Sequence, residues 1–372
     1  MRLRRLTMAM AGICLAAALT ACGQKADTTP TSTAATEATT AESTTKESAK
    51  ESTTAAATTT AAAESNSASE ATKTEEGISI RIGSMKGPTS MGLVSLMKKA
   101  DNGETANAYT FDMVTAADEL VALLTKEELE IATIPANLAS VLYNKNEGGI
   151  TVLNINTLGV LDVVENGKQI TGIQDLEGKT VYMTGQGTVP EYSFRYVLEK
   201  NGLTDKVTLE FKSEPTEVVN LVAETEGAVG LLPQPFVTTA VMQNDKLNIA
   251  LNLTEEWDKV SEGKSSMVTG VTVVRTAFLE ENEEAVKNFL ADYKESVDAV
   301  NADADAAAAL IEEYGIVKAP VAKKALPYCS ITYMDGEEMK NALSGYLESL
   351  LGQEAKSIGG KLPADDFYYI AK

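Results

Sequence analysis

The spacing of hydrophobic positions separates a polar N-terminal part from a folded part that starts at Ile78. Alternation of apolar and polar residues through 78–82 predicts a strand, and a helix is expected to open at Pro88. Further strands are expected at 109–114, 129–134, 180–183, 207–211, 228–232 and 267–274, and helices from about 137 and at 189–200, 215–224 and 235–243. This order predicts an α/β fold with parallel sheets covered by helices.

The strands and helices form two similar runs, the second of which begins near Thr180. Thr115, with Asp118 at the capping-box position, is expected to cap a helix. Thr254 is a similar N-cap, and Trp257 behind it is expected to pack at a lobe edge. Beyond Val274 the pattern predicts almost only helices, which indicates that the chain returns to close a first lobe.

The first residues have the pattern of an export signal. Arg2, Arg4 and Arg5 precede an apolar stretch at 8–19 that is too short to span a bilayer as a mature helix. The following Leu-Thr-Ala-Cys at 19–22 resembles the bacterial lipobox. We therefore expect a signal peptide at 1–21, a lipidated Cys22, and attachment to the outer face of a cell membrane. An ordinary signal peptide that happens to contain cysteine is the alternative.

The segment 22–77 is rich in Thr, Ala, Ser and Glu, and beyond Cys22 it has no Val, Ile, Leu, Met or aromatic residue. Such a composition cannot bury apolar surface, so a disordered linker is expected. A flexible chain of this length spans roughly 40 Å, enough to hold a domain clear of a membrane. Glycosylation of its threonines is a further possibility.

Composition excludes several classes of function. The formal net charge is −21, which opposes binding to nucleic acid. The chain has no histidine, so Ser-His-Asp and Cys-His catalysis and the usual zinc sites are excluded. No carboxylate pair stands out as an acid–base couple. We expect no enzyme activity, no cofactor and no metal. With Cys14 removed and Cys22 lipidated, Cys329 has no partner for a disulfide.

A first candidate binding segment joins the strand at 78–82 to the helix at Pro88. Gly87 permits a tight turn, and the backbone N–H groups of a helix start favour anionic or polar ligand groups. The candidate ligand-binding residues of this segment are Ser84, Lys86, Gly87, Thr89 and Ser90. The spacing is not that of a P-loop, and a plain capped helix start is the alternative.

A second junction repeats this arrangement and adds the candidates Thr184, Gly185, Gln186, Gly187 and Thr188. Two polar residues in Pro-containing turns after strands, Asn137 and Gln234, complete the candidate set; stiff structural loops are the alternative. If the two runs form two lobes, both junctions can face one cleft. Arg195 lies on the helix after the second junction and is expected to pair with surface carboxylates.

The segment 173–180, Ile-Gln-Asp-Leu-Glu-Gly-Lys-Thr, resembles the "DL-x-GK" strand start of substrate-binding proteins for ABC importers. The two junctions, Ile-Ala-Thr-Ile-Pro-Ala-Asn at 131–137 and the ending at 361–369 are similar to the same proteins. The group that the chain resembles most is the one for nitrate, sulfonates, taurine and thiamine-pyrimidine precursors. The scarcity of Arg departs from the sulfonate and nitrate binders, so a neutral or zwitterionic solute is equally compatible, with Tyr182 or Tyr192 as a further contact.

The resemblance implies a two-lobe, type II periplasmic-binding-protein-like fold with the ligand cleft between the lobes. Lobe 1 would comprise 78–158 and 268–372, and lobe 2 would comprise 159–267. It implies an extracytoplasmic component that delivers a small solute to a membrane permease and its ATPase. Two alternatives remain: an enzyme of thiamine-pyrimidine or menaquinone-pathway type on the same fold, and a surface sensor or adhesin.

Overall fold

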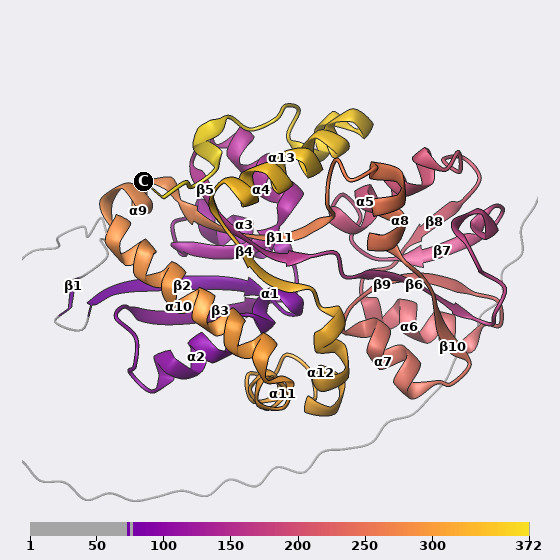
Figure 1. Cartoon of the computed structure of the whole chain (residues 1–372), viewed down its shortest axis with the longest axis horizontal. Coiled ribbons are helices and arrows are strands. Elements are labelled where there is room, and N and C mark those ends of the chain that lie inside the picture. The colour runs from indigo at the N-terminus through magenta and orange to yellow at the C-terminus, as the bar shows by residue number, and fades with distance from the viewer. Residues whose placement is uncertain (1–72, 75–76, 372) are drawn as a thin grey trace, which may run out of the picture. The chain divides into compact units, whose positions relative to one another are not determined.

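The computed structural model describes residues 73–74 and 77–371. The predicted signal peptide, Cys22 and nearly all of the predicted linker lie outside the described residues. The described strands form two sheets within one compact unit of the chain (Figure 1).

The larger sheet has the strand order β1-β2-β4-β11-β5-β12, with β3 paired to β2. Its strands are β1 Lys73–Thr74, β2 Gly77–Met85, β3 Ala108–Val114, β4 Ile131–Pro135, β5 Ile150–Leu158, β11 Val268–Arg275 and β12 Ile331–Met334. β3 and β4 run parallel to β2, whereas β11 is antiparallel to both β4 and β5.

The smaller sheet has the order β10-β6-β9-β7-β8. Its strands are β6 Leu161–Asn166, β7 Thr180–Met183, β8 Thr208–Phe211, β9 Val229–Pro233 and β10 Leu247–Asn252. β7 is parallel to β8 and β9, and β6 is antiparallel to β9 and β10.

Helices cover both sheets on both faces (Figure 1). The helices beside the larger sheet are α1 Pro88–Met91, α2 Val94–Asp101, α3 Ala117–Thr125, α4 Ala136–Lys145, α9 Thr276–Glu281, α10 Glu283–Ala302, α11 Ala304–Glu313, α12 Ala319–Ala325 and α13 Gly336–Gln353. Those beside the smaller sheet are α5 Val189–Lys200, α6 Pro215–Glu224, α7 Phe236–Gln243 and α8 Leu253–Ser261. Short 3₁₀ helices are η1 Ile173–Leu176, η2 Leu326–Tyr328, η3 Ala355–Ile358 and η4 Asp365–Phe367.

The expected parallel pairing is present between β2, β3 and β4 and between β7, β8 and β9, but each sheet also contains antiparallel pairs. The cause is the path of the chain. β5 ends at Leu158 and leads into the smaller sheet, and the chain returns at Val268 to form β11 beside β5. Because the chain returns at the end of the larger sheet from which it left, with Val268 paired to Leu158, β11 runs antiparallel to β5.

Two expected helix caps also differ from the structure. The N-cap of α3 is Ala116, without a side-chain cap from Thr115, and the N-cap of α8 is Asn252, whose Oδ1 accepts from Glu255 N. Trp257 is fully buried, where it packs against Tyr196 and Tyr346. The part of the chain after β11 is mostly helical, as expected, with the four-residue strand β12 within it.

Two segments connect the sheets: the short link between β5 and β6, and residues 262–267 between α8 and β11. The first link is packed closely at Gly159, where an added Cβ would lie 1.9 Å from Thr254 Oγ1. Ser330 Oγ donates to Gly159 O at 2.6 Å, and Leu158 N donates to Ser330 O at 3.0 Å. The link is therefore packed against Thr254 and hydrogen-bonded to Ser330.

The hydrophobic core continues across both sheets. One cluster contains residues of β4, β5, β11, β7, β9, α5, α8 and α13, and so joins the two sheets through buried side chains. A second cluster lies under α2 and α10, and a third lies under α6 and α7. Cys329 is a free, buried thiol, and burial raises its pKa to about 12, so it stays protonated and unreactive at neutral pH.

Candidate functional site

The first junction lies between β2 and α1. Gly87 has φ 142°, a conformation that favours glycine. The hydroxyls here already have local partners: Thr89 Oγ1 donates to Met85 O at 3.0 Å, and Ser90 Oγ donates to Gly87 O at 3.0 Å. Lys86 is exposed. The polar side chains of this turn thus stabilise the turn itself.

Ser84 lies deeper, at the point where β2 pairs with β4 opposite Thr133. The same row continues through Thr272 and Asn154 on β11 and β5. Thr272 Oγ1 donates to Asn154 Oδ1 at 2.9 Å, but Ser84 Oγ, Thr133 Oγ1 and Asn154 Nδ2 are buried without hydrogen-bond partners. Unpartnered buried polar atoms are rare in native proteins, and they often mark a functional site or ordered water.

Asn137 follows β4 at the start of α4 and is fully buried. Its Nδ2 donates to Ser357 O at 3.1 Å and to Gly187 O at 3.4 Å. Gly187 belongs to the second junction, between β7 and α5 of the smaller sheet. The structure therefore brings two of the predicted site residues together across the two sheets.

The second junction is a turn built on two glycines with positive φ, Gly185 at 79° and Gly187 at 73°. Thr188 Oγ1 donates to Gly185 O at 2.8 Å. Gly187 N donates to Glu191 Oε2 at 2.8 Å, and Arg195 Nε donates to Glu191 Oε1 at 2.7 Å. The expected pairing of Arg195 with a carboxylate is confirmed. Gln186 and Thr184 have exposed and partly exposed side chains, respectively.

Gln234 lies in the turn between β9 and α7, which contains a cis Gln234–Pro235 bond, and its side chain is directed into the smaller sheet. Its Oε1 accepts from Thr238 N at 3.3 Å and Thr238 Oγ1 at 2.8 Å, and its Nε2 donates to Asp162 Oδ2 at 3.2 Å. Its backbone N donates to Val160 O, in the link between the sheets. The side-chain amide of Gln234 thus fastens the turn to β6, and its backbone N–H fastens the turn to the link.

Sequence reasoning missed Asp162, the buried partner of Gln234 on β6. Asn252 Nδ2 donates to its other oxygen at 2.8 Å. Burial raises the pKa of the Asp162 carboxyl to about 6, although the hydrogen bonds from Asn252 and Gln234 act in the opposite direction. The signal available in the sequence is a single acidic residue inside the apolar run at 160–164.

This pKa predicts a pH-dependent contribution to stability. Because the folded chain holds the Asp162 proton more tightly than the unfolded chain, the contribution is complete below about pH 4 and is lost as pH rises through about 6. Asp162→Asn should remove up to about 3 kcal/mol of this pH dependence. Urea unfolding at several pH values between these limits measures it. Exposed Asp258→Asn is the control, and an unchanged pH profile for Asp162→Asn would contradict the assignment.

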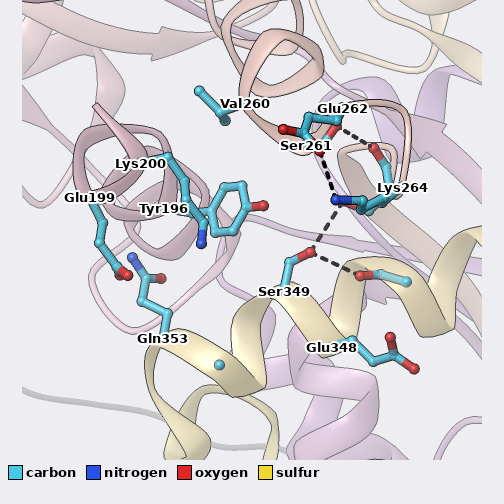
Figure 2. A pocket seen from close by; sticks show the side chains of 13 residues that line it. Tyr196, Glu199, Lys200, Val260, Ser261, Glu262, Lys264, Glu348, Ser349 and Gln353 are labelled. Carbon is cyan, nitrogen blue, oxygen red and sulfur yellow. Dashed lines mark hydrogen bonds and ion pairs between the residues drawn. The ribbon is translucent and has the colours of Figure 1, made fainter. Parts of the chain in front are cut away.

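An open groove of about 500 Å³ lies between α5, the 262–265 segment and α13 (Figure 2). Ser265 and Ser349 line it with their Oγ atoms 3.2 Å apart, and Tyr196 lines it from α5. A second pocket of about 440 Å³ adjoins it along α5 and α13, since Glu199 and Gln353 line both. The first cavity is lined by none of the predicted ligand residues, whereas the second is lined by Tyr192, the further contact considered above.

The arginines of the described part of the chain are all paired with glutamates. Arg81 N and Nε donate to Glu130 Oε2 at 2.7 and 3.0 Å, and Arg275 Nη2 lies 3.6 Å from Glu130 Oε1. The hydrogen bond to Glu130 raises the pKa of Arg81. With Arg195 on Glu191, no guanidinium among residues 73–74 and 77–371 lacks a carboxylate partner.

Within the described residues, no helix is both long and apolar enough to cross a membrane. In the same residues no group of three or more Cys, Asp or Glu is placed to hold a metal ion.

Residues 149–307 match the family model described as NMT1/THI5 like. No curated protein has significant similarity to the chain. Among solved structures, an ABC transporter protein from Parabacteroides distasonis is 23% identical, with a TM-score of 0.66 over 79% of this chain and 99% of that one. The periplasmic aliphatic sulphonate binding protein SsuA from Escherichia coli is 14% identical, with a TM-score of 0.65 over 79% and 92%.

A Candida albicans protein described as exhibiting the generic periplasmic binding protein structural fold is 16% identical, with a TM-score of 0.52 over 78% of this chain and 92% of that one. These likenesses confirm the predicted periplasmic-binding-protein fold. The family match, which includes 173–180 and the second junction, confirms the predicted resemblance. The first junction and the segments 131–137 and 361–369 lie outside the matched residues.

Proposed function

We propose that this chain is the extracytoplasmic solute-binding component of an ABC importer, held to a membrane through Cys22. The observation that carries the proposal is the contact between Asn137 and Gly187, because it joins two loops that follow strands of different sheets. Polar loops at strand ends are the usual binding position in α/β folds. The NMT1/THI5 like match and the ABC transporter neighbours agree with this function.

The proposed site consists of the two junctions with Asn137 and Gln234. Gln234 acts indirectly, since its amide is bonded to Asp162 and Thr238 and positions the turn. The residues 78–158 with 268–372, and 159–267, act as the two lobes that close on a solute. Bending occurs at the two connecting segments, as in hinge closure of other binding proteins.

Binding should stabilise the folded chain. A solute at a hundredfold its dissociation constant adds about 2.7 kcal/mol to the free energy of unfolding. Thermal unfolding of the purified full chain with sulfonates, nitrate, amino acids and thiamine-pyrimidine precursors measures this. A variant in the groove, Lys264→Ala, should keep the stabilisation, because Lys264 contacts Glu262 and lies outside the proposed site. Absence of stabilisation by every such solute would contradict the proposal.

Lobe closure also has an internal reporter. Trp257 is the single tryptophan of the chain, and it packs between Tyr196 of α5 and Tyr346 of α13. A solute that bends the connecting segments should change the environment of this indole. Fluorescence titration with any solute that raises the unfolding temperature should therefore give a saturable change.

A further inference from the structure

The side-chain amide of Asn137 has one orientation that its neighbours permit. Both atoms near its Nδ2, Ser357 O and Gly187 O, are carbonyl oxygens and can only accept. A flipped amide would place Oδ1 against these two acceptors. Oδ1 is consequently the atom that remains free, and it is buried without a hydrogen-bond partner.

An unpaired buried carbonyl oxygen is unfavourable relative to a paired one, because it has lost its hydrogen bonds to water without replacement. A bound molecule that offers an N–H or O–H group would remove this cost. A sulfonate or nitrate has only acceptor oxygens and negative charge, so it would be repelled by Oδ1. The unpartnered hydroxyls of Ser84 and Thr133 can donate or accept, and the unpartnered Asn154 Nδ2 can only donate. A solute that carries both donor and acceptor groups therefore suits this set better than an anion that has acceptors alone.

The charges of the described residues also disfavour an anionic solute. Arg81 and Arg275 are bound to Glu130, and Arg195 is bound to Glu191. Lys86 at the first junction is exposed, where salt screens its charge. A desolvated anion would need a buried cation or several free donors, and the candidate residues offer Asn137 as an acceptor.

We infer that Asn137 is a specificity residue whose Oδ1 accepts a hydrogen bond from an N–H or O–H donor of a solute without net negative charge. The inference rests on the proposed function and narrows it to one chemical class. It distinguishes this chain from its structural neighbour in Escherichia coli, which is an aliphatic sulphonate binding protein.

Two sets of probes of similar size test the inference on the full chain. The first set contains uncharged donors such as cytosine and 4-amino-5-hydroxymethyl-2-methylpyrimidine. The second contains anions without donors, such as methanesulfonate, ethanesulfonate and nitrate. We expect stabilisation and calorimetric binding by at least one member of the first set and by none of the second.

Asn144 provides a matched control. Its Nδ2 donates to Ile358 O at 2.9 Å and Lys361 O at 2.8 Å, and its Oδ1 is also unpartnered, but none of its hydrogen bonds reaches the second junction. Asn137→Ala should weaken binding of the active probe about tenfold, the effect of one lost hydrogen bond. Asn144→Ala should lower stability without changing the dissociation constant.

Ser140→Ala serves as a second control that should also leave the dissociation constant unchanged. Ser140 Oγ donates to Ile358 O at 2.8 Å in the same buried region. Binding of an anion from the second set, or equal effects of Asn137→Ala and Asn144→Ala on affinity, would overturn the inference and leave the proposed function intact. Failure of both probe sets and of the wider solute panel would overturn the proposed function, and the inference with it.

Discussion

Replacing Trp257 by alanine should lower the free energy of unfolding by about 3–5 kcal/mol. The indole is fully buried, with ring centroids 4.2 Å from Tyr196 and 5.4 Å from Tyr346. Its Nε1 donates to both Ser265 O and Ser265 Oγ at 3.2 Å. The change would leave a cavity between α5, α8 and α13 and would remove the hydrogen bonds to the segment that connects the sheets.

Urea unfolding followed by circular dichroism measures this loss, since the variant has no tryptophan to follow by fluorescence. Trp257→Phe keeps much of the ring volume and should cost roughly half as much. A loss below about 1 kcal/mol for Trp257→Ala would mean that the aromatic contacts at this position do not hold the helices together.

Gly159→Ala should have the second large effect, a loss of about 3 kcal/mol. The new Cβ would lie 1.9 Å from Thr254 Oγ1 and 2.6 Å from Met267 Cε, so the link between β5 and β6 would have to shift. Thermal and urea unfolding measure the change. Gly172→Ala is the control, because a Cβ there meets nothing within 4 Å and its φ of −164° suits any residue.

A second substitution makes the steric explanation testable. Thr254 Oγ1 has no hydrogen-bond partner, so Thr254→Ala alone should cost little. The double variant Gly159→Ala, Thr254→Ala should recover more than half of the lost stability. Additive losses would show that crowding against Thr254 is not the cause.

The bounds of helices with strong local start signals could be predicted from the sequence alone. Pro190 and Pro215 stand in the first turns of α5 and α6, and the predicted bounds of both helices equal those in the structure. The glycine-containing turn of the second junction was likewise expected, and Gly185 and Gly187 have positive φ there.

The strands near the connecting segments were harder to predict. β5, β6 and β10 were not among the expected elements, and they pair with partners far away in the sequence. Their direction depends on how the chain crosses between sheets, which local periodicity does not encode. β12 was missed for the same reason, since its four residues pair with β5 about 175 positions earlier.

The sequence indicated which loops carry the candidate residues, but it did not indicate which of these loops touch each other. The loops that hold Asn137 and Gly187 were identified from the strand-to-helix pattern, yet their meeting depends on packing between two sheets. The direction of the Gln234 amide depends on Asp162, 72 residues away. A single sequence reports which residues are polar, and the fold decides whether they bind a solute or each other.

Native mass spectrometry of the purified full chain tests solute binding most directly. The account predicts a non-covalent complex with one small solute, either carried through purification or formed one-to-one with an uncharged donor from the probe set, and lost on denaturation. A spectrum with only the unliganded mass, unchanged by every solute of the panel, would contradict it.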